Sequence, residues 1–317
     1  MENIINYINH KFGVSIKTFQ EALKLNPGAE GYILGSIGEL LFKDYIESIG
    51  YEALRIKEKP DGGYNAKSTE ARGDFYIRKK GSEQDKWYVV ECKGVKSNSE
   101  KRSGLIKQSS CINILTKHSV NREKHITSIL KSGKNAYSKS KEKWEKKNKG
   151  RFPKFKWSKI NPGAGIPDLT DLWNSKKDIE EWLKSFSRNS FSEDAYWNLI
   201  APIRLLQTHM PSTRIDPVTK LKSTGPLVTE FNILCVDLFL KTGKHEFVYA
   251  NANDLNPQAK SPNHLQQNYT IDILTKKDNY KRHPLLKPWY DSIDECIKVT
   301  KPKPRNLDES QLDKRKI

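Results

Sequence analysis

Residues 73–94, GDFYIRKKGSEQDKWYVVECKG, constrain the fold of this 317-residue chain more than any other segment. Two runs rich in Tyr, Phe, Trp and Val, at 75–78 and 87–92, flank a Gly-Ser-Glu-Gln-Asp turn. This composition and spacing are typical of two antiparallel strands joined by a turn. The segment therefore predicts a β-hairpin, which forms one part of a larger sheet.

Helical and strand-like patterns follow one another over much of the remaining chain. Apolar residues at helical spacing predict a helix up to about Leu25 and a second helix over 30–49. A second hairpin is expected from the runs at 232–240 and 246–251, and a third strand-like run spans 268–274. We therefore expect an α/β fold in which helices flank a mixed central sheet.

Three charged residues stand at the ends of the first predicted hairpin. Asp74 heads the first run, and Glu91 and Lys93 end the second. Because residues i and i+2 of a strand share a face, Glu91 and Lys93 point together and Cys92 points to the other side. Antiparallel pairing brings Asp74 back next to them. The alternative is a solvated hairpin that carries an ordinary ion pair.

Two carboxylates and a lysine at neighbouring strand ends suit the metal-dependent hydrolysis of phosphodiesters. Carboxylates hold Mg²⁺, or Mn²⁺ in its place, and leave coordination positions for water and a phosphate oxygen. A lysine beside them orients or deprotonates the water and offsets the developing negative charge. We predict Asp74, Glu91 and the backbone carbonyl of Cys92 as metal ligands, with Lys93 as a catalytic residue.

Asp74, followed 17 positions later by Glu91-Cys92-Lys93 in strand–turn–strand context, resembles the PD-(D/E)XK nuclease superfamily, which includes many restriction endonucleases. The resemblance covers roughly residues 30–115, and Gly73 stands where the family motif has proline. It implies a restriction-endonuclease-like core, a Mg²⁺ cofactor and double-stranded DNA as substrate. The chain looks most like a type II restriction endonuclease, which implies a homodimer and a cognate DNA methyltransferase in the host.

Other interpretations stay open beside this one. A repair, recombination or modification-dependent nuclease of the same superfamily would share the three residues and differ in substrate. A basic nucleic-acid-binding protein without catalytic activity would use the hairpin as structure alone. Two literal Pro-Asp pairs, Pro60-Asp61 and Pro167-Asp168, fit the motif less well, because neither leads through a strand to a Glu-x-Lys.

Two further residues are candidates from their place in the resemblance. Related nucleases often take an acidic residue from the helix before the first strand, and Glu39 matches that place. At about 100° per residue, Glu39 falls at the edge of the polar arc, so a surface role is equally open. Gln108, on the helix after the motif, either contacts the nucleophilic water or a phosphate, or is a surface residue.

The net charge of +18, from 56 Lys and Arg against 38 Asp and Glu, favours a polyanionic partner, with nucleic acid the first candidate. Residues 131–159 hold 12 Lys or Arg and 2 Glu, a net charge of +10. Five aromatic residues interleave with them, which predicts a DNA-contacting arm, although a solvated lysine-rich helix is the alternative. The candidate contact residues are Lys141, Lys143, Trp144, Lys146, Lys147, Arg151, Lys154 and Lys156.

Base readout is not assigned by any pattern in the sequence. Arg204, Arg214 and Lys222 are alternative candidates for DNA contact outside the basic stretch, since Arg is the expected partner of guanine. His118 and His125 lie seven residues apart with no acidic residue near in sequence. We expect these two histidines to be surface or backbone-contacting residues.

Composition divides the chain into a discontinuous core, 1–130 and 226–300, a mainly helical basic insertion, 131–225, and a polar tail, 301–317, predicted to be flexible. No apolar run approaches the ~18 residues of a membrane-spanning helix. The N-terminus lacks the pattern of a signal peptide, and the four cysteines show no zinc or redox spacing. These features favour a cytoplasmic protein that does not contact membranes.

Overall fold

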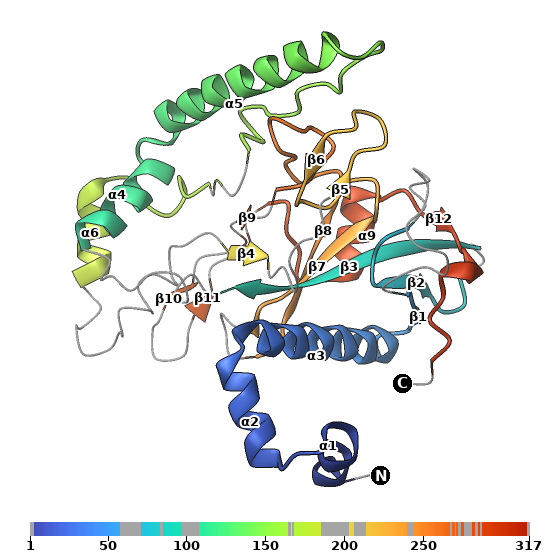
Figure 1. The fold of residues 1–317 in the computed structure, drawn as a ribbon. Coiled ribbons are helices and arrows are strands. Elements are labelled where there is room, and N and C mark those ends of the chain that lie inside the picture. Colours follow the sequence, from blue (N-terminus) through green and yellow to red (C-terminus); the bar gives the residue numbers. More distant parts are fainter. Residues whose placement is uncertain are drawn as a thin grey trace.

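The protein is described by a computed structural model in which a mixed β-sheet is flanked by helices (Figure 1). The described residues are 3–57, 71–82, 85–96, 108–163, 166, 168–184, 203–205, 214–239, 244–266, 268–269, 271, 274–275, 281–282, 285 and 287–315. The helices are α1 (Ile4–Phe12), α2 (Ile16–Leu25), α3 (Pro27–Ser48), α4 (Gln108–His118), α5 (Arg122–Glu145), α6 (Lys176–Lys184), α9 (Ile293–Thr300) and the 3₁₀ helix η3 (Glu309–Gln311). The longer strands are β1 (Tyr51–Arg55), β2 (Phe75–Lys79), β3 (Lys86–Lys96), β7 (Ile233–Asp237) and β8 (Phe247–Asn251). The short strands are β4 (Ile203–Leu205), β5 (Arg214–Ile215), β6 (Lys222–Ser223), β9 (Asn268–Tyr269), β10 (Leu274–Thr275), β11 (Lys281–Arg282) and β12 (Arg305–Asn306).

The centre of the sheet has the spatial order β1–β2–β3–β7–β8. Neighbouring strands run antiparallel, except that β3 and β7 run parallel. The long β3 also pairs with β12 near its beginning and with β4 near its end. Every residue of β7 is buried, as expected for an inner strand covered on both faces. Both predicted hairpins, β2–β3 and β7–β8, are therefore confirmed, and so is the mixed α/β fold class.

Each face of the sheet has its own hydrophobic core, because side chains alternate along the strands. On one face, Phe42 of α3 packs with Phe75, Cys235 and Ile293, the last of these from α9. The other face, which we call the open face, buries Val89 and Leu234, among others, under loops and the C-terminal segment. Helices α3 and α9 thus cover one face, and no helix of the described residues contributes to the core of the open face.

The first two predicted helices are found, with different ends. The stretch up to Leu25 is two helices, because Gly13 ends α1 in a left-handed conformation (φ 67°) and the Ser15 side chain caps α2. Helix α3 begins earlier than predicted, where Pro27 occupies its first turn and the Asn26 side chain accepts from the backbone N–H of Gly28. Gly50 follows its C-terminus with φ 90°.

The C-terminal segment differs from the flexible tail that its polar composition suggests. Strand β12 pairs with β3, and Leu312 bridges to Ile56 of the segment after β1. The Gln311 side chain is buried and accepts a 2.9 Å hydrogen bond from the Tyr76 hydroxyl. A few well-placed contacts therefore hold a polar segment that hydrophobic patterning does not reveal.

Helices α4, α5 and α6 lie outside the sheet. Helix α5 is on the side of the sheet opposite α3 (Figure 1). Helix α5 runs through residue 130, so the helical part begins before the predicted boundary at 130/131. Strand β4, inside the predicted insertion, pairs with β3. Among the described residues, no helix is long and apolar enough to cross a membrane.

Candidate active site

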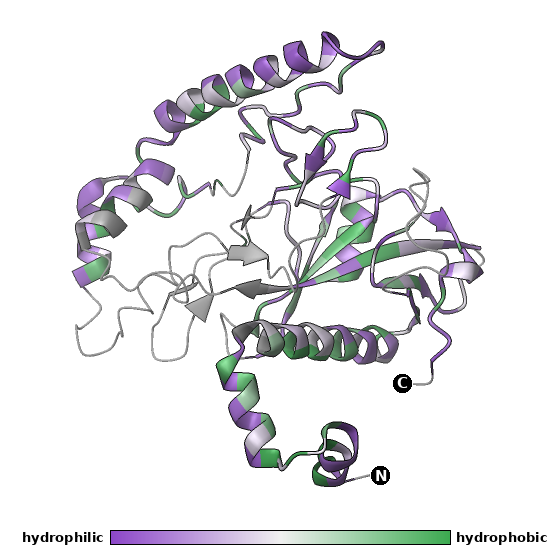
Figure 2. Cartoon of the chain, in the orientation of Figure 1, coloured by the Kyte–Doolittle hydropathy of each residue, from purple (hydrophilic) through white to green (hydrophobic). Residues whose placement is uncertain are grey.

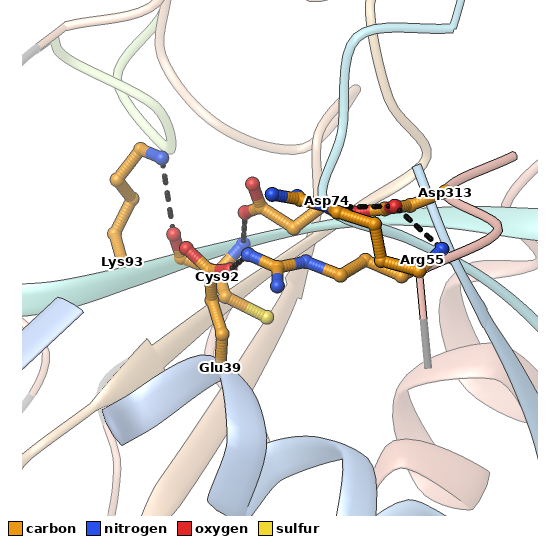
Figure 3. Close-up of polar contacts among 7 residues, drawn as sticks. Glu39, Arg55, Asp74, Cys92, Lys93 and Asp313 are labelled. Atoms are coloured by element: carbon orange, nitrogen blue, oxygen red, sulfur yellow. Dashed lines mark hydrogen bonds and ion pairs between the residues drawn. The ribbon is translucent and has the colours of Figure 1, made fainter. Parts of the chain in front are cut away.

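The β2–β3 pairing places Asp74 beside the end of β3. Phe75 is paired with Val90, and the backbone N–H of Asp74 donates to the Val90 carbonyl at 2.8 Å. The Oδ2 atom of Asp74 accepts a 2.6 Å hydrogen bond from the backbone N–H of Cys92 (Figure 3). The hairpin thus fixes the Asp74 carboxylate between Glu91 and Lys93 along the chain of β3.

Gly73, where the family motif has proline, has a local steric reason. A Cβ atom at this position would lie 2.6 Å from both the Val89 Cγ1 atom and the Val90 carbonyl oxygen. Real Cβ atoms do not approach other atoms so closely, and proline also has a Cβ. The close passage of the chain over β3, which positions Asp74, therefore requires glycine here.

Glu91 and Lys93 point to the open face of the sheet, as their i,i+2 spacing predicts. The Lys93 ammonium lies 2.5 Å from a Glu91 carboxylate oxygen and 3.0 Å from the Cys92 carbonyl oxygen. Glu91 is 6% exposed, which is unusual for a charged side chain in a sheet. The Lys93 ammonium therefore bridges the Glu91 carboxylate and the Cys92 carbonyl. These are two of the three predicted metal ligands.

Glu39 reaches the same group from α3. Its Oε2 atom accepts a 2.8 Å hydrogen bond from the Arg55 guanidinium of β1, and about a fifth of its side chain is exposed (Figure 3). The Asp313 backbone N–H donates to the Arg55 carbonyl at 2.9 Å, so the C-terminal segment supports this arrangement. Of the two interpretations of Glu39, its position favours membership of the site. We call Glu39, Asp74, Glu91 and Lys93 the acidic cluster.

The pKa directions show a cluster that lacks positive charge. Burial, reinforced by the nearby Asp74, raises the pKa of Glu91 to about 8, although Lys93 opposes the shift. Burial and Asp74 likewise raise the pKa of Glu39 to about 7, against the opposing effect of Arg55. Desolvation lowers the pKa of Lys93, but the attraction of Glu91 and Asp74 outweighs it and raises that pKa. A further cation would stabilise Glu91 and Glu39 in their ionised form.

The acidic cluster offers oxygen donors to a divalent metal ion. Among the described residues, no group of three or more His, Cys, Asp or Glu side chains is arranged to hold a metal ion by itself. Mg²⁺ needs fewer protein ligands, since it keeps several waters and is commonly bound by one or two carboxylates. Glu91 and the Cys92 carbonyl already share one cation, the Lys93 ammonium. The donor set, all oxygen, fits Mg²⁺ or Mn²⁺.

Two arrangements near the cluster carry no signal in the sequence. Glu230, 4% exposed, lies 3.5 Å from Arg72 and 3.5 Å from Arg214, and its charge is felt by Glu91. Asp237, at the end of β7, holds His245 Nδ1 at 2.7 Å while the imidazole stacks on a phenyl ring. Glu230 and Asp237 are far in sequence from the residues of the acidic cluster, so only the fold brings them near it.

The basic stretch 131–159, which we call the arm, consists of most of α5 and an extended segment that returns along it. Gly133 permits the close approach of the two, because a Cβ there would lie 2.5 Å from the Trp157 ring. Tyr137 packs against both Phe152 and Phe155, with ring centroids 5.6 and 5.2 Å apart. The interleaved aromatic residues therefore hold the arm together.

Trp144 is a correction to the predicted set of DNA contacts. Its side chain is buried, packs against Phe152 and donates a 2.6 Å hydrogen bond from Nε1 to the Thr219 carbonyl. Trp157 likewise donates to the Pro257 carbonyl at 2.8 Å. Because Trp144 anchors the arm to loops on the open face, its ring is not accessible to a nucleic-acid base.

Most of the basic side chains of the arm are exposed. Lys141 and Lys146 form ion pairs with Glu145 and Glu142 within α5, at 3.8 and 2.8 Å. The remaining predicted contacts are exposed, and none forms an ion pair with another described residue; they are Lys143, Lys147, Arg151, Lys154 and Lys156. Figure 2 shows α5 as mostly hydrophilic, in contrast to the strands of the sheet. The arm thus exposes its cations to solvent. Its aromatic residues, which we call the aromatic seam, hold it together; they are Tyr137, Trp144, Phe152, Phe155 and Trp157.

The other predicted residues have varied positions. Gln108 is the first residue of α4, but its side chain lies outside the described residues, as do Pro60-Asp61 and the side chain of Arg204. Arg214 is engaged by Glu230, and Lys222 is exposed in β6. Asp168 forms an ion pair with Arg122 at 3.1 Å, so it has a structural role.

His118 and His125 form a contact that their expected surface role did not include. Their rings lie edge to face, with centroids 5.1 Å apart. Burial lowers the pKa of His118 to about 4, and the neighbouring His125 adds to the shift. His118 is therefore a neutral packing residue that joins α4 to α5.

The three cysteines whose side chains the structure describes, Cys92, Cys235 and Cys296, are free thiols. Cys92 and Cys235 are register partners on β3 and β7, beneath the acidic cluster.

Comparisons with protein-family models, with curated proteins and with solved structures find no match for this chain. The arguments below therefore depend on the geometry of the molecule.

Proposed function

We propose that the protein is a Mg²⁺-dependent endonuclease that hydrolyses phosphodiester bonds in double-stranded DNA, of the PD-(D/E)XK type. One observation carries the proposal: the β2–β3 pairing places Asp74 against the backbone of Glu91-Cys92-Lys93, and α3 brings Glu39 to the same point. Burying a glutamate and gathering two further carboxylates around it costs free energy, which a hairpin with a purely structural role would not require. This arrangement favours a catalytic site over the structural alternative.

Asp74, Glu91 and the Cys92 carbonyl would hold the metal ion. When bound, Mg²⁺ or Mn²⁺ activates water and neutralises charge on the phosphate. The high pKa values of Glu91 and Glu39 mean that these groups lose their protons readily only when positive charge is near. The cluster is therefore suited to take up a cation together with a phosphate.

Lys93 contributes a fixed positive charge. Its raised pKa keeps the side chain protonated at neutral pH, so in this state Lys93 orients water and stabilises negative charge on the phosphate. A protonated amine does not accept a proton, which makes it a poor base as it stands. Glu39, whose pKa of about 7 lies near neutrality, is better matched to exchange a proton with water.

The arm would supply binding to the DNA backbone. It is anchored to the loops around Thr219 and Pro257, on the open face toward which Glu91 and Lys93 point. Exposed lysines attract phosphates without regard to sequence and make affinity strongly salt-dependent. Cleavage at the cluster and binding by the arm are therefore separable functions.

The decisive experiment incubates the purified protein with phage DNA and Mg²⁺ and resolves the products on a gel. Discrete fragments would support a type II restriction endonuclease, which we expect to act as a homodimer and to have a cognate methyltransferase in its host. A smear would indicate a general nuclease. Cleavage confined to methylated or supercoiled plasmids would favour a modification-dependent, repair or recombination enzyme.

A matched pair of variants tests whether any cleavage belongs to this site. Asp74→Asn keeps an oxygen that can accept from the Cys92 N–H, so it preserves the hairpin and weakens only the metal site. Glu52→Gln, on β1, removes a half-exposed carboxylate paired with Arg78 and serves as the control. Equal cleavage by Asp74→Asn and the parent, or no cleavage of any DNA, would contradict the proposal and leave the non-catalytic DNA-binding protein.

A further inference from the structure

The β5–β6 hairpin has one side that is fixed to the molecule and one side that is open to solvent. Arg214 of β5 is paired with Ser223 of β6, and Ile215 with Lys222. Because residues opposite each other in an antiparallel pair share a face, each pair belongs to one side of the hairpin. The first pair is half-buried and forms the inner side. The second pair is exposed and forms the outer side.

An ion pair and a hydrogen bond fix the inner side of the β5–β6 hairpin. Arg214 lies 3.5 Å from Glu230, whose charge is felt by Glu91. The Ser223 hydroxyl donates to the Gln258 side chain at 2.9 Å. The inner side is therefore attached to the neighbourhood of the acidic cluster.

The turn of the β5–β6 hairpin is built around one buried carboxylate. Asp216 is 2% exposed and accepts hydrogen bonds from the Val218 backbone N–H at 3.0 Å and from the Asn263 side chain at 2.9 Å. The Thr219 hydroxyl donates to the same carboxylate. The Thr219 carbonyl in turn accepts from Nε1 of Trp144. The turn is thus held in one geometry and is attached to the arm.

The outer side of the β5–β6 hairpin and its turn combine exposed apolar and exposed basic side chains. Val218 is 61% exposed and Ile215 is 47% exposed. Lys220 and Lys222 are exposed beside them. The single acidic residue of 214–223, Asp216, is buried, so the hairpin itself exposes positive charge only. Exposed β-branched apolar residues on a short strand pair are a liability unless a partner covers them.

Lys220 has a backbone conformation that favours glycine. Its φ of 58° lies in the left-handed region, which is unfavourable for a residue with a side chain. The hydrogen bonds of the turn impose this conformation. The Lys220 N–H donates to the Asp216 carbonyl at 2.8 Å, and the Asp216 N–H donates to the Leu221 carbonyl at 2.9 Å. A lysine kept at a position that glycine would occupy with less strain indicates a role for its side chain.

We infer that the β5–β6 hairpin enters the major groove of bound double-stranded DNA, where Val218 contacts the 5-methyl groups of thymine bases and Lys220 contacts a phosphate. A two-stranded hairpin fits the major groove, and the thymine methyl is the apolar group that base edges offer there. The exposed lysines are complementary to the phosphates that border the groove. The hairpin lies between the arm and the sheet (Figure 1), so a duplex that contacts the arm and reaches the acidic cluster meets it.

The inference rests on the proposed function for its ligand, double-stranded DNA, and adds the element that contacts the bases. The arm accounts for attraction to phosphates, which carries no sequence information. Arg214, a candidate for base contact from the sequence, belongs to the inner side and is engaged by Glu230. Contact with base edges therefore falls to the outer side and the turn of the hairpin.

An anisotropy assay without divalent metal tests the contact with thymine. The two probes are a duplex from phage DNA and a copy in which deoxyuridine, which lacks the 5-methyl group, replaces thymidine. The parent protein should bind the copy about fourfold more weakly, the factor expected for one buried methyl group. Val218→Ser should bind both duplexes with the lower affinity. Val299→Ser, which is 57% exposed on α9, is the matched control and should behave as the parent.

Lys220→Gly tests the contact with phosphate. Glycine relieves the left-handed conformation, so urea denaturation should show a variant at least as stable as the parent. Its DNA affinity should fall about threefold to tenfold at low salt, and the slope of log affinity against log salt should become shallower by about one. Lys301→Gly, with φ 48° at the C-terminal end of α9, is the matched control and should change neither quantity.

Two results would overturn the inference and leave the proposed function intact. The first is equal binding of the thymidine and deoxyuridine duplexes by the parent, a comparison that needs no variant. The second is DNA affinity of Val218→Ser and Lys220→Gly equal to that of their controls, while phage DNA is still cleaved. A parent protein that neither binds nor cleaves any DNA contradicts the proposed function, and the inference fails with it.

Discussion

The acidic cluster and the arm are opposite solutions to the placement of charge. The cluster gathers three carboxylates around one lysine, and burial raises the pKa of Glu91 and of Glu39. The arm exposes its lysines to water, and its aromatic residues supply the packing that lysines cannot. The difference teaches that charge density alone does not identify a site: the cluster gathers its charged groups at one point, whereas the arm spreads its charges along its length.

The largest expected effect separates chemistry from binding. Lys93→Ala removes the only ammonium of the acidic cluster and should lower the cleavage rate by at least ~10³-fold. DNA affinity in a filter-binding or anisotropy assay should change less than about twofold, because one half-buried lysine contributes little to phosphate binding. Lys80→Ala, an exposed lysine in the β2–β3 turn, should leave both quantities unchanged. A variant that loses binding and cleavage together would remove the distinction between the two regions.

The aromatic seam is the next target, since it determines whether the arm is a structure or a solvated helix. Trp144→Ala should lower the free energy of unfolding by about 3–5 kcal/mol, as buried tryptophans do. Trp144→Phe keeps the apolar contact with Phe152 and loses the hydrogen bond to the Thr219 carbonyl, so its effect should be about 1–2 kcal/mol. Urea denaturation measures both. Unchanged stability of Trp144→Ala would restore the original interpretation of Trp144 as a DNA contact.

Neutralising the arm should weaken DNA binding without removing catalysis. Changing Lys143, Lys147, Arg151, Lys154 and Lys156 to Gln should lower the affinity about 10–100-fold at low salt and make its salt dependence less steep. At saturating protein the cleavage rate should persist, because the acidic cluster is intact. Lys80→Gln with Lys298→Gln, which removes exposed lysines elsewhere, provides the control. Unaltered affinity of the arm variant would exclude the arm as the DNA-binding region.

The smallest expected effect is the pH dependence of stability, which arises from the acidic cluster. Glu91 and Glu39 have folded pKa values of about 8 and about 7, above the ordinary value of 4.5, so between pH 4.5 and 8 the folded state binds more protons than the unfolded state. Stability without metal should therefore fall as pH rises through this window. Differential scanning fluorimetry should show a Tm lower by a few degrees at pH 8 than at pH 6, and Mg²⁺ should raise the Tm more at pH 8.

Variants identify the groups that cause this pH dependence. Glu91→Gln cannot ionise, so its Tm without metal should change less between pH 6 and pH 8 than the Tm of the parent. Glu52→Gln should retain the full dependence, since no unusual burial surrounds that carboxylate. If Glu91→Gln has the same pH dependence as the parent, the buried carboxylates are not the titrating groups.

Several parts of the site could be predicted because they depend on local geometry. The alternation of a strand places Glu91 and Lys93 on one face, and a hairpin returns its first residue to its last. Asp74, Glu91 and Lys93 were therefore identified from 22 consecutive residues, 73–94. Glu39 was ambiguous, because helical periodicity defines an angle around α3 and not what stands opposite that angle.

Other parts depended on contacts between distant segments. Glu230 reaches the neighbourhood of Glu91 from a loop before β7, and Asp237 lies beside the end of β3 only because β3 and β7 are parallel neighbours. The arm was recognised by its charge, but the partners of Trp144 and Trp157 are 75 and 100 residues away. The interleaving of aromatic and basic residues was thus correctly noticed and partly misassigned.

The sequence by itself determined the hairpin, the common face of Glu91 and Lys93, the return of Asp74 to them and the net charge of the arm. Each of these follows from the period of a strand or from counting charges, which need only neighbouring residues. Tertiary structure decided that Glu39 faces the cluster, that Trp144 faces inward, that residues 301–315 pack on the sheet and that α1 and α2 remain uncovered. Whether a side chain is buried depends on which distant segment lies against it, and local periodicity does not carry that information.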